Sequence, residues 1–219
     1  MKFYSSYLNL KMELTDTGTN ILVLESPKIY RETIQNLLLS LEEENEDWIF
    51  SDNENIVKKN KSLDIIHSLF SLNFDSRKIQ KAVIDELYGI AVNEDNYEKT
   101  SNLMSNLETY LYELEWQTQY NLRIALDDFH NILKAGVLEI ASSDNLVERL
   151  DEYIKISARL LKTKVLILVG FQGFFREEEW KQIEKAARNE ELILLCIEKE
   201  LVFESENKIV IDNDVCRVV

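Results

Sequence analysis

The chain has 219 residues, of which 45% are hydrophobic and 30% charged, and its formal net charge is −15. These values are typical of a soluble globular protein that can bury a real core, and the negative total argues against a protein that coats nucleic acid over its whole surface. No apolar run approaches the roughly 18 residues of a membrane span, and the N-terminus has no signal-peptide core. The two cysteines, Cys196 and Cys216, indicate a reduced, cytosolic protein without a disulfide framework.

The N-terminal segments predict strands and one helix. Residues 2–14 alternate weakly and predict a short β-hairpin, and residues 19–24 (TNILVL) predict a buried strand. Ser26 and Pro27 then mark a helix start, because serine is a favoured N-cap and proline a favoured first helical residue. Apolar side chains continue at helical spacing to Leu41, and residues 48–50 predict another short strand.

The middle of the chain is predominantly helical. Residues 63–72 (LDIIHSLFSL) are compatible with a strand or a helix. Asp75 or Ser76 then caps a first helix, a second helix is predicted at about 96–119, and a third at 125–135 ends at Gly136. The first two are long, amphipathic and mostly polar, which indicates an extended helical arm outside the sheet.

The C-terminal segments predict a parallel sheet. Residues 137–141 (VLEIA) predict a strand, followed by a helix that Ser142, Ser143 or Asp144 caps. Two apolar runs, 164–169 (KVLILV) and 191–197 (ELILLCI), flank an amphipathic helix, as expected for a βαβ unit buried on both faces. Two short strands, 208–211 and 215–218, complete the chain. We therefore predict an α/β fold with a mostly parallel sheet formed by residues 1–73 and 136–219, and a helical insertion at 74–135.

The predicted sheet lacks the chemistry of a nucleotide site. The turn after the first run reads VGFQGFFREEE, with Gly170 and Gly173 but no GxxxxGK[ST] or GxGxxG motif. The helix that follows opens with three glutamates, 177–179, which would repel a phosphate. The layout is that of a nucleotide-binding core and the chemistry is not, which favours a binding module over an NTPase.

No catalytic set stands out. His67 and His130 lie in neither HExxH nor CxxC spacing, and Cys196 lies within an apolar strand, so structural roles are favoured for all three. Four carboxylates follow predicted strands, where α/β proteins bind ligands: Glu25, Glu198, Asp212 and Asp214. They suggest a Mg²⁺- or Mn²⁺-dependent nuclease, against the alternative that an acidic chain places carboxylates in turns by chance.

Three segments are basic and free of acids: 58–61, 77–81 and 155–164. Either they are solvated faces, or they converge on one anion-binding surface. A group of acids around the end of the second long helix is compatible with a Ca²⁺ site, although a solvated acidic face is the favoured interpretation: Glu113, Glu115, Asp127 and Asp128.

The order of these segments resembles the spacer-acquisition proteins of type II-A CRISPR systems, the Csn-two family. The resemblance lies in residues 49–86 (IFSDNENIVKKNKSLDIIHSLFSLNFDSRKIQKAVIDE), in 133–143 (LKAGVLEIASS) and in the last strands, LLKTKVLILVGFQGFFREEEW, LILLCIE and IVIDND. It covers nearly the whole chain.

The resemblance implies a core like a P-loop ATPase without the phosphate loop, with an inserted helical leg. It also implies a homotetrameric ring that holds double-stranded DNA on a positive inner face, favours free ends and is stabilised by calcium. The family has no attributed enzymatic activity and assists the CRISPR integrase complex and the RNA-guided effector nuclease. A ring can be negative outside and positive within, so the net charge is compatible with this role.

The resemblance also points to particular residues. The family's connection bears lysines where this chain has Lys58, Lys59 and Lys61, and Arg77, Lys78 and Lys81 form the next acid-free patch. Where the family has several acids after the long helix, this chain reads QTQYNLRIALDD, with Arg123 inside the segment. The nearest candidates for the calcium ligands are therefore the acids at 113, 115, 127 and 128. Two functions stay open: a non-enzymatic DNA-binding ring, and a metal-dependent nuclease or degenerate nucleotide hydrolase on the same core.

Overall fold

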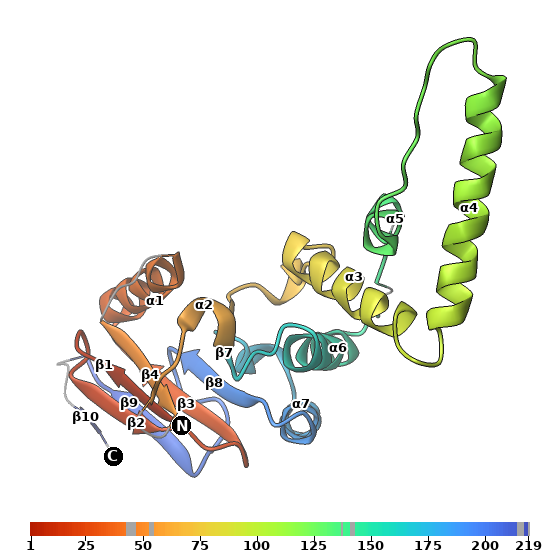
Figure 1. Cartoon of the computed structure of the whole chain (residues 1–219). Coiled ribbons are helices and arrows are strands. Elements are labelled where there is room, and N and C mark those ends of the chain that lie inside the picture. Colours follow the sequence, from red (N-terminus) through yellow and green to blue (C-terminus); the bar gives the residue numbers. More distant parts are fainter. Residues whose placement is uncertain (43–46, 53–54, 137, 141–142, 214–216, 219) are drawn as a thin grey trace. The chain divides into compact units, whose positions relative to one another are not determined.

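The computed structural model describes residues 1–42, 47–52, 55–136, 138–140, 143–213 and 217–218. The chain divides into two compact units (Figure 1). One combines Met1–Asn73 with Ala141–Val219 and contains all the strands of the described residues; the other, Phe74–Ile140, is helical.

The α/β unit contains a six-stranded sheet in the order β10-β9-β3-β8-β7-β6. Its strands are β3 (Thr19–Leu24), β6 (Leu63–Ile66), β7 (Val165–Val169), β8 (Ile193–Glu198), β9 (Asn207–Ile211) and β10 (Arg217–Val218). All neighbours pair in parallel except β10, which pairs antiparallel with β9 at one edge. The predicted α/β class with a mostly parallel sheet is confirmed.

The three central strands, β3, β7 and β8, are buried at every residue. One face of the sheet, which carries Leu22, Ile167 and Leu195, shares an apolar core with a second, smaller sheet. Because side chains alternate along a strand, the intervening residues point to the opposite face, where a C-terminal helix packs on β8. Coverage on both faces explains why these strands read as continuous apolar runs.

The smaller sheet is antiparallel, in the order β2-β1-β4-β5. Its strands are β1 (Lys2–Ser5), β2 (Leu10–Glu13), β4 (Trp48–Asp52) and β5 (Asn55–Ile56). The predicted hairpin at 2–14 is confirmed as β1 and β2, and the strand predicted at 48–50 lies in this sheet. The Phe3 ring stacks on Trp48 and Phe50, with centroid distances of 5.4 and 5.0 Å, so aromatic packing holds β4 beside β1.

The helices of the α/β unit are α1 (Pro27–Glu42), α2 (Lys59–Ser62), α6 (Leu146–Arg159) and α7 (Glu177–Asn189), with two 3₁₀ turns, η1 (Leu69–Ser71) and η2 (Gln172–Phe174). Helix α1 starts at Pro27 as predicted, and the ambiguous segment 63–72 forms β6 followed by η1. Helices α6 and α7 pack against each other.

Two predictions in the C-terminal half are wrong in detail. Residues 138–140 do not form the predicted strand, and 137 and 141 lie outside the described residues. The N-cap of α6 is Asn145, whose side-chain oxygen accepts hydrogen bonds from Val147 N (2.9 Å) and Glu148 N (3.4 Å), and not Ser143 or Asp144. Ser142 lies outside the described residues.

The helical unit contains α3 (Arg77–Ala91), α4 (Tyr97–Gln117) and α5 (Phe129–Ala135). The third helix begins at Phe129 and not at 125, because the Asp128 carboxylate accepts a hydrogen bond from Asn131 N at 3.1 Å and caps the helix there. Helix α5 packs on α3, where His130 Nε2 lies 2.9 Å from Asp85 Oδ1 and its ring meets that of Tyr88.

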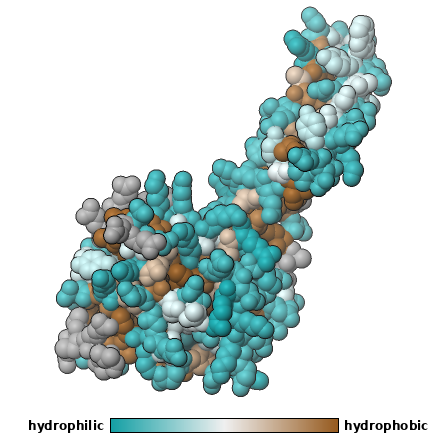
Figure 2. Space-filling view, turned by 60° about the horizontal axis from the view of Figure 1, so that its bottom comes forward, coloured by the Kyte–Doolittle hydropathy of each residue, from teal (hydrophilic) through white to brown (hydrophobic). Residues whose placement is uncertain are grey.

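Helix α4 buries none of its described residues. Its exposed large apolar side chains are Tyr97, Leu103, Tyr110, Tyr112 and Trp116, the last 87% exposed. Figure 2 shows hydrophobic residues, in brown, among hydrophilic and intermediate ones on the surface of the helical unit. Exposed large apolar side chains in this number on one helix commonly mark an interaction surface in soluble proteins.

Candidate nucleic-acid interface

The first basic cluster is Lys58, Lys59 and Lys61, at the single-turn helix α2. The backbone turns because Lys61 N and Ser62 N donate hydrogen bonds to Lys58 O at 3.2 and 3.1 Å. Val57, immediately before the cluster, is buried and donates its N–H to Phe50 O at 2.8 Å, which anchors the turn to the small sheet. The position of these lysines is therefore set by the fold of the α/β unit.

The three lysines differ in exposure. Lys58 and Lys61 are exposed, and neither forms an ion pair with any residue that the structure describes. Lys59 is half-buried, and burial lowers the pKa of its ammonium group. Lys58 and Lys61 are thus the members of this cluster whose charge is exposed to solvent.

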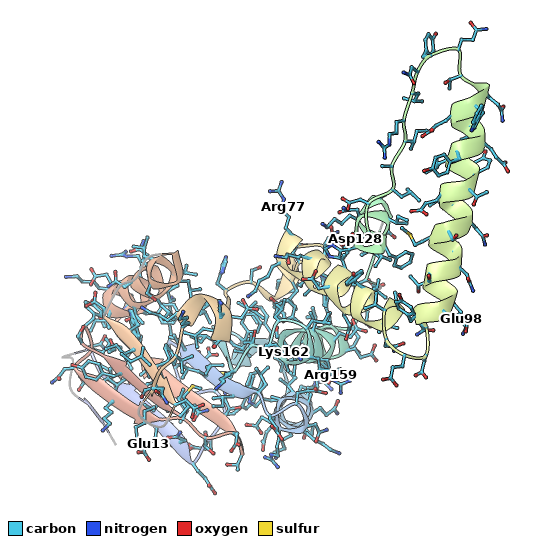
Figure 3. The ribbon with its side chains drawn as sticks, viewed as in Figure 1. Glu13, Arg77, Glu98, Asp128, Arg159 and Lys162 are labelled. Atoms are coloured by element: carbon cyan, nitrogen blue, oxygen red, sulfur yellow. The ribbon has the colours of Figure 1, made fainter. Side chains whose placement is uncertain are left out.

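The second basic cluster is Arg77, Lys78 and Lys81, at the start of α3 in the helical unit. Ser76 caps the helix, because its hydroxyl accepts a hydrogen bond from Ile79 N at 3.3 Å. Ile79 is buried, whereas the three cations are exposed, and Figure 3 shows the Arg77 side chain extending away from the ribbon. None of the three is ion-paired with a described residue.

The second basic cluster lies at the N-terminal end of α3, where positive charge does not stabilise a helix. Cations at a helix N-terminus oppose the helix dipole, so they do not serve the stability of α3. The first turn of α3 has no acidic residue to offset them. A local excess of positive charge in a chain of net charge −15 is what a ligand-binding surface requires.

The third basic segment, 155–164, is largely neutralised by acids. Lys155 pairs with Asp151 at 2.5 Å, Arg159 with Glu190 at 2.5 Å, and Lys164 with Asp52 at 2.9 Å. The hydrogen bonds between Arg159 and Glu190 raise the pKa of the guanidinium and lower that of the carboxyl. In the same segment Lys162 is exposed and is not ion-paired with a described residue. This segment is a weaker candidate for DNA contact than the other two clusters.

Three of the four predicted calcium ligands are engaged in local contacts. Glu115 accepts a hydrogen bond from Ile124 N, Asp127 accepts from Asn131 Nδ2, and Asp128 caps α5, at whose start Figure 3 labels it. Within the described part of the chain, no three His, Cys, Asp or Glu side chains group as metal ligands would, and Glu113 is therefore not part of such a group. As the side chains lie here, they do not fit a calcium ion, which needs six to eight oxygens.

Among the carboxylates after the strands, those that the structure describes do not make a metal centre either. Glu25 is exposed and Glu198 is buried, Asp214 lies outside the described residues, and the described residues contain no cluster that could hold a metal. Cys196 is fully buried, and burial raises the pKa of its thiol well above the usual value, as expected for the predicted inert role.

Sequence reasoning missed what Glu198 does. It is the last residue of β8, and its carboxylate accepts hydrogen bonds from Phe171 N at 3.0 Å and Gln172 N at 3.1 Å. The available signal was the position of Gly170 directly after a buried strand, because such a glycine often adopts the left-handed conformation that directs backbone N–H groups toward an anion.

The fold and the candidate site together define the class of protein to which this chain belongs. This is an α/β protein with a mostly parallel sheet and a separate helical unit, which presents surface cations and, in its described residues, no group of side chains that could hold a metal ion. No helix in the described part of the chain is sufficiently long and apolar to cross a membrane.

The comparison with protein families identifies the particular family. Residues 40–215 match the family described as CRISPR-associated protein (Cas_Csn2), and the chain belongs to this Csn2 family. A search of curated proteins found no significant match. Membership of the Csn2 family implies a role in CRISPR adaptation, and the family is generally non-catalytic.

Proposed function

We propose that this protein binds linear double-stranded DNA without sequence preference, as a non-enzymatic homotetrameric ring that assists the acquisition of new CRISPR spacers. It would act in the cytoplasm beside the CRISPR integrase complex and the RNA-guided effector nuclease. Family membership supports the role in adaptation. In the same proposal, the core is a relative of P-loop ATPases that lacks the phosphate loop, and the helical unit is the inserted leg.

One observation carries the DNA-binding part of this proposal. Two short acid-free segments carry exposed cations without described ion-pair partners, Lys58 and Lys61 in one and Arg77, Lys78 and Lys81 in the other. Contacts from such side chains to phosphate oxygens position a protein on DNA without reading the bases. That is the behaviour needed to accept DNA of any sequence.

The exposed apolar side chains of α4 support the oligomer. A helix with no buried residue among those described, and with Trp116 87% exposed, gains stability if a second copy of the chain covers it. Sedimentation velocity at micromolar concentration should give a tetramer, and a monomer with and without Ca²⁺ would refute the ring.

Gel-shift titrations of linear and circular duplexes of one sequence, each with and without Ca²⁺, test the proposed function. We expect linear DNA to bind more tightly, and a second, unrelated sequence to bind as tightly as the first. Equal affinity for linear and circular DNA would refute the preference for ends, and no binding at low salt would refute DNA binding itself. The arms with and without Ca²⁺ show whether DNA binding depends on calcium.

The alternative function, a metal-dependent nuclease or a degenerate nucleotide hydrolase, predicts hydrolysis of DNA or of a nucleotide. We expect no hydrolysis of ATP, GTP or duplex DNA with Mg²⁺, because the phosphate loop is absent and Glu177–Glu179 open the helix after β7. Hydrolysis at ordinary enzyme rates that is lost in Glu25→Ala or Asp212→Ala would favour the enzyme instead.

A further inference from the structure

The turn after β7 has the backbone geometry of an anion-binding nest. Gly170 is left-handed, with φ of +69°, and Phe171 follows in the right-handed region, with φ −94° and ψ −31°. Successive residues of opposite hand direct their N–H groups into one concavity, which attracts negative charge. Gly170 is required here, because any side chain would be strained at this φ, and a Cβ would lie 3.2 Å from the Tyr30 hydroxyl.

This nest already holds a carboxyl group of the chain itself. Strand β8 lies beside β7, with Ile197 opposite Val169, and this pairing brings Glu198 to the turn. Its Oε1 accepts from Phe171 N and from Gln172 N, at 3.0 and 3.1 Å, while Gly170 N donates to Ile197 O. The Glu198 side chain is almost completely buried, so the carboxylate is a fixed part of the interior.

The surroundings are those of a ligand site. The turn lies at the carboxyl ends of parallel strands, and it leads toward a helix, which is where α/β proteins bind phosphate groups. Gln172 is completely buried, and neither polar atom of its side-chain amide has a hydrogen-bond partner in the described part of the protein. Buried amides are rarely left in this state, so Gln172 supplies unused donors and an acceptor at the same turn.

We propose that Gly170–Gln172 is an oxyanion site that the chain's own Glu198 carboxylate occupies, and that this contact closes the carboxyl edge of the sheet to phosphate-bearing ligands. Removing the carboxylate should open a site for inorganic phosphate. The inference goes beyond the proposed DNA binding, which uses other residues, and either can fail without the other.

The test uses the full chain with Glu198→Ala, and two control variants. Glu198→Gln keeps an oxygen that can accept the two N–H groups, and Glu200→Ala removes an exposed carboxylate two residues along the chain. In sodium phosphate, compared with sodium chloride of equal ionic strength, the melting temperature of Glu198→Ala should rise by about 2–4 °C at phosphate several times above its Kd. The parent and both controls should show no such difference. A folded Glu198→Ala protein without a phosphate-specific shift would overturn the proposal.

Hydrogen exchange of the peptide that contains Phe171 and Gln172, followed by mass spectrometry, gives a second measurement that does not need the variant. In the parent, these amides should exchange slowly and be insensitive to phosphate. Exchange in the parent as fast as in an open loop would show that Glu198 does not hold the turn, and would overturn the proposal even if Glu198→Ala does not fold. In Glu198→Ala, exchange should be at least about tenfold faster, since hydrogen bonds to a charged group are lost, and phosphate should restore protection.

Discussion

Replacing Lys58, Lys59 and Lys61 together with alanine should weaken the binding of linear duplex DNA and flatten its dependence on salt. Each lysine that contacts a phosphate releases condensed counterions, so log affinity falls with log salt by about 0.9 per contact. Because contacts to the phosphate backbone do not read the bases, the loss should be equal for unrelated sequences.

The structure sets the expected magnitude. Lys58 and Lys61 are exposed, whereas Lys59 is half-buried and burial lowers its pKa, so two to three lysines per chain contribute. The salt slope should therefore fall by about 1.8–2.7 per bound subunit. Between roughly 50 and 200 mM salt, the parent should then lose about 12-fold to 40-fold more affinity than the variant for each subunit that contacts DNA.

A matched control removes the same number of cations from ion pairs. The variant Lys155→Ala/Arg159→Ala/Lys164→Ala has the same net charge as the test variant, but its three side chains pair with Asp151, Glu190 and Asp52. Its salt slope should change much less, because neutralised cations release few counterions from DNA. Fluorescence anisotropy with a labelled linear duplex at several salt concentrations measures both slopes.

Two results would refute this reasoning. If the test variant binds with the affinity and salt slope of the parent, Lys58, Lys59 and Lys61 do not contact DNA. If both variants lose the same slope, total charge and not the position of the cations governs binding. Circular dichroism of each variant confirms that the fold is kept, which we expect because Lys58 and Lys61 are exposed.

Three further predictions concern stability. Burial raises the pKa of the Glu198 carboxyl from 4.5 to about 7, so the parent should lose stability relative to Glu198→Gln as the pH rises from about 5 to about 8, by up to roughly 3 kcal/mol. Urea titrations at the two pH values measure this difference, and a difference that is independent of pH would show that Glu198 does not ionise in this range. Asp128→Ala should cost the helical unit about 1 kcal/mol in EDTA as well as in Ca²⁺, since Asp128 caps α5; a loss seen only with Ca²⁺ would instead make Asp128 a calcium ligand. A double-mutant cycle of His130→Ala and Asp85→Asn should give a coupling of about 0.2–1 kcal/mol; a coupling of zero would mean that this pair does not hold α5 on α3.

Local patterns in the sequence determined the elements of the core. The runs at 19–24, 164–169 and 191–197 are continuously apolar because both faces of their strands are covered, and each became a central strand of the parallel sheet. Ser76 and Pro27 marked helix starts correctly because capping chemistry acts within one turn. Boundaries failed where a neighbouring residue was the better cap, as at Asn145 and Asp128.

Only the tertiary structure determined which cations are neutralised by ion pairs. It also determined that the Glu198 carboxyl accepts hydrogen bonds from the turn after β7. The pair of Lys155 and Asp151 lies within one helical turn, but Arg159 meets Glu190 across 31 residues and Lys164 meets Asp52 across 112. Glu198 reaches the turn at Phe171 only because β7 and β8 are neighbours in the sheet. Ion pairs and buried hydrogen bonds depend on distances of a few ångströms between segments that are remote in the chain, and no local pattern of residues encodes those distances.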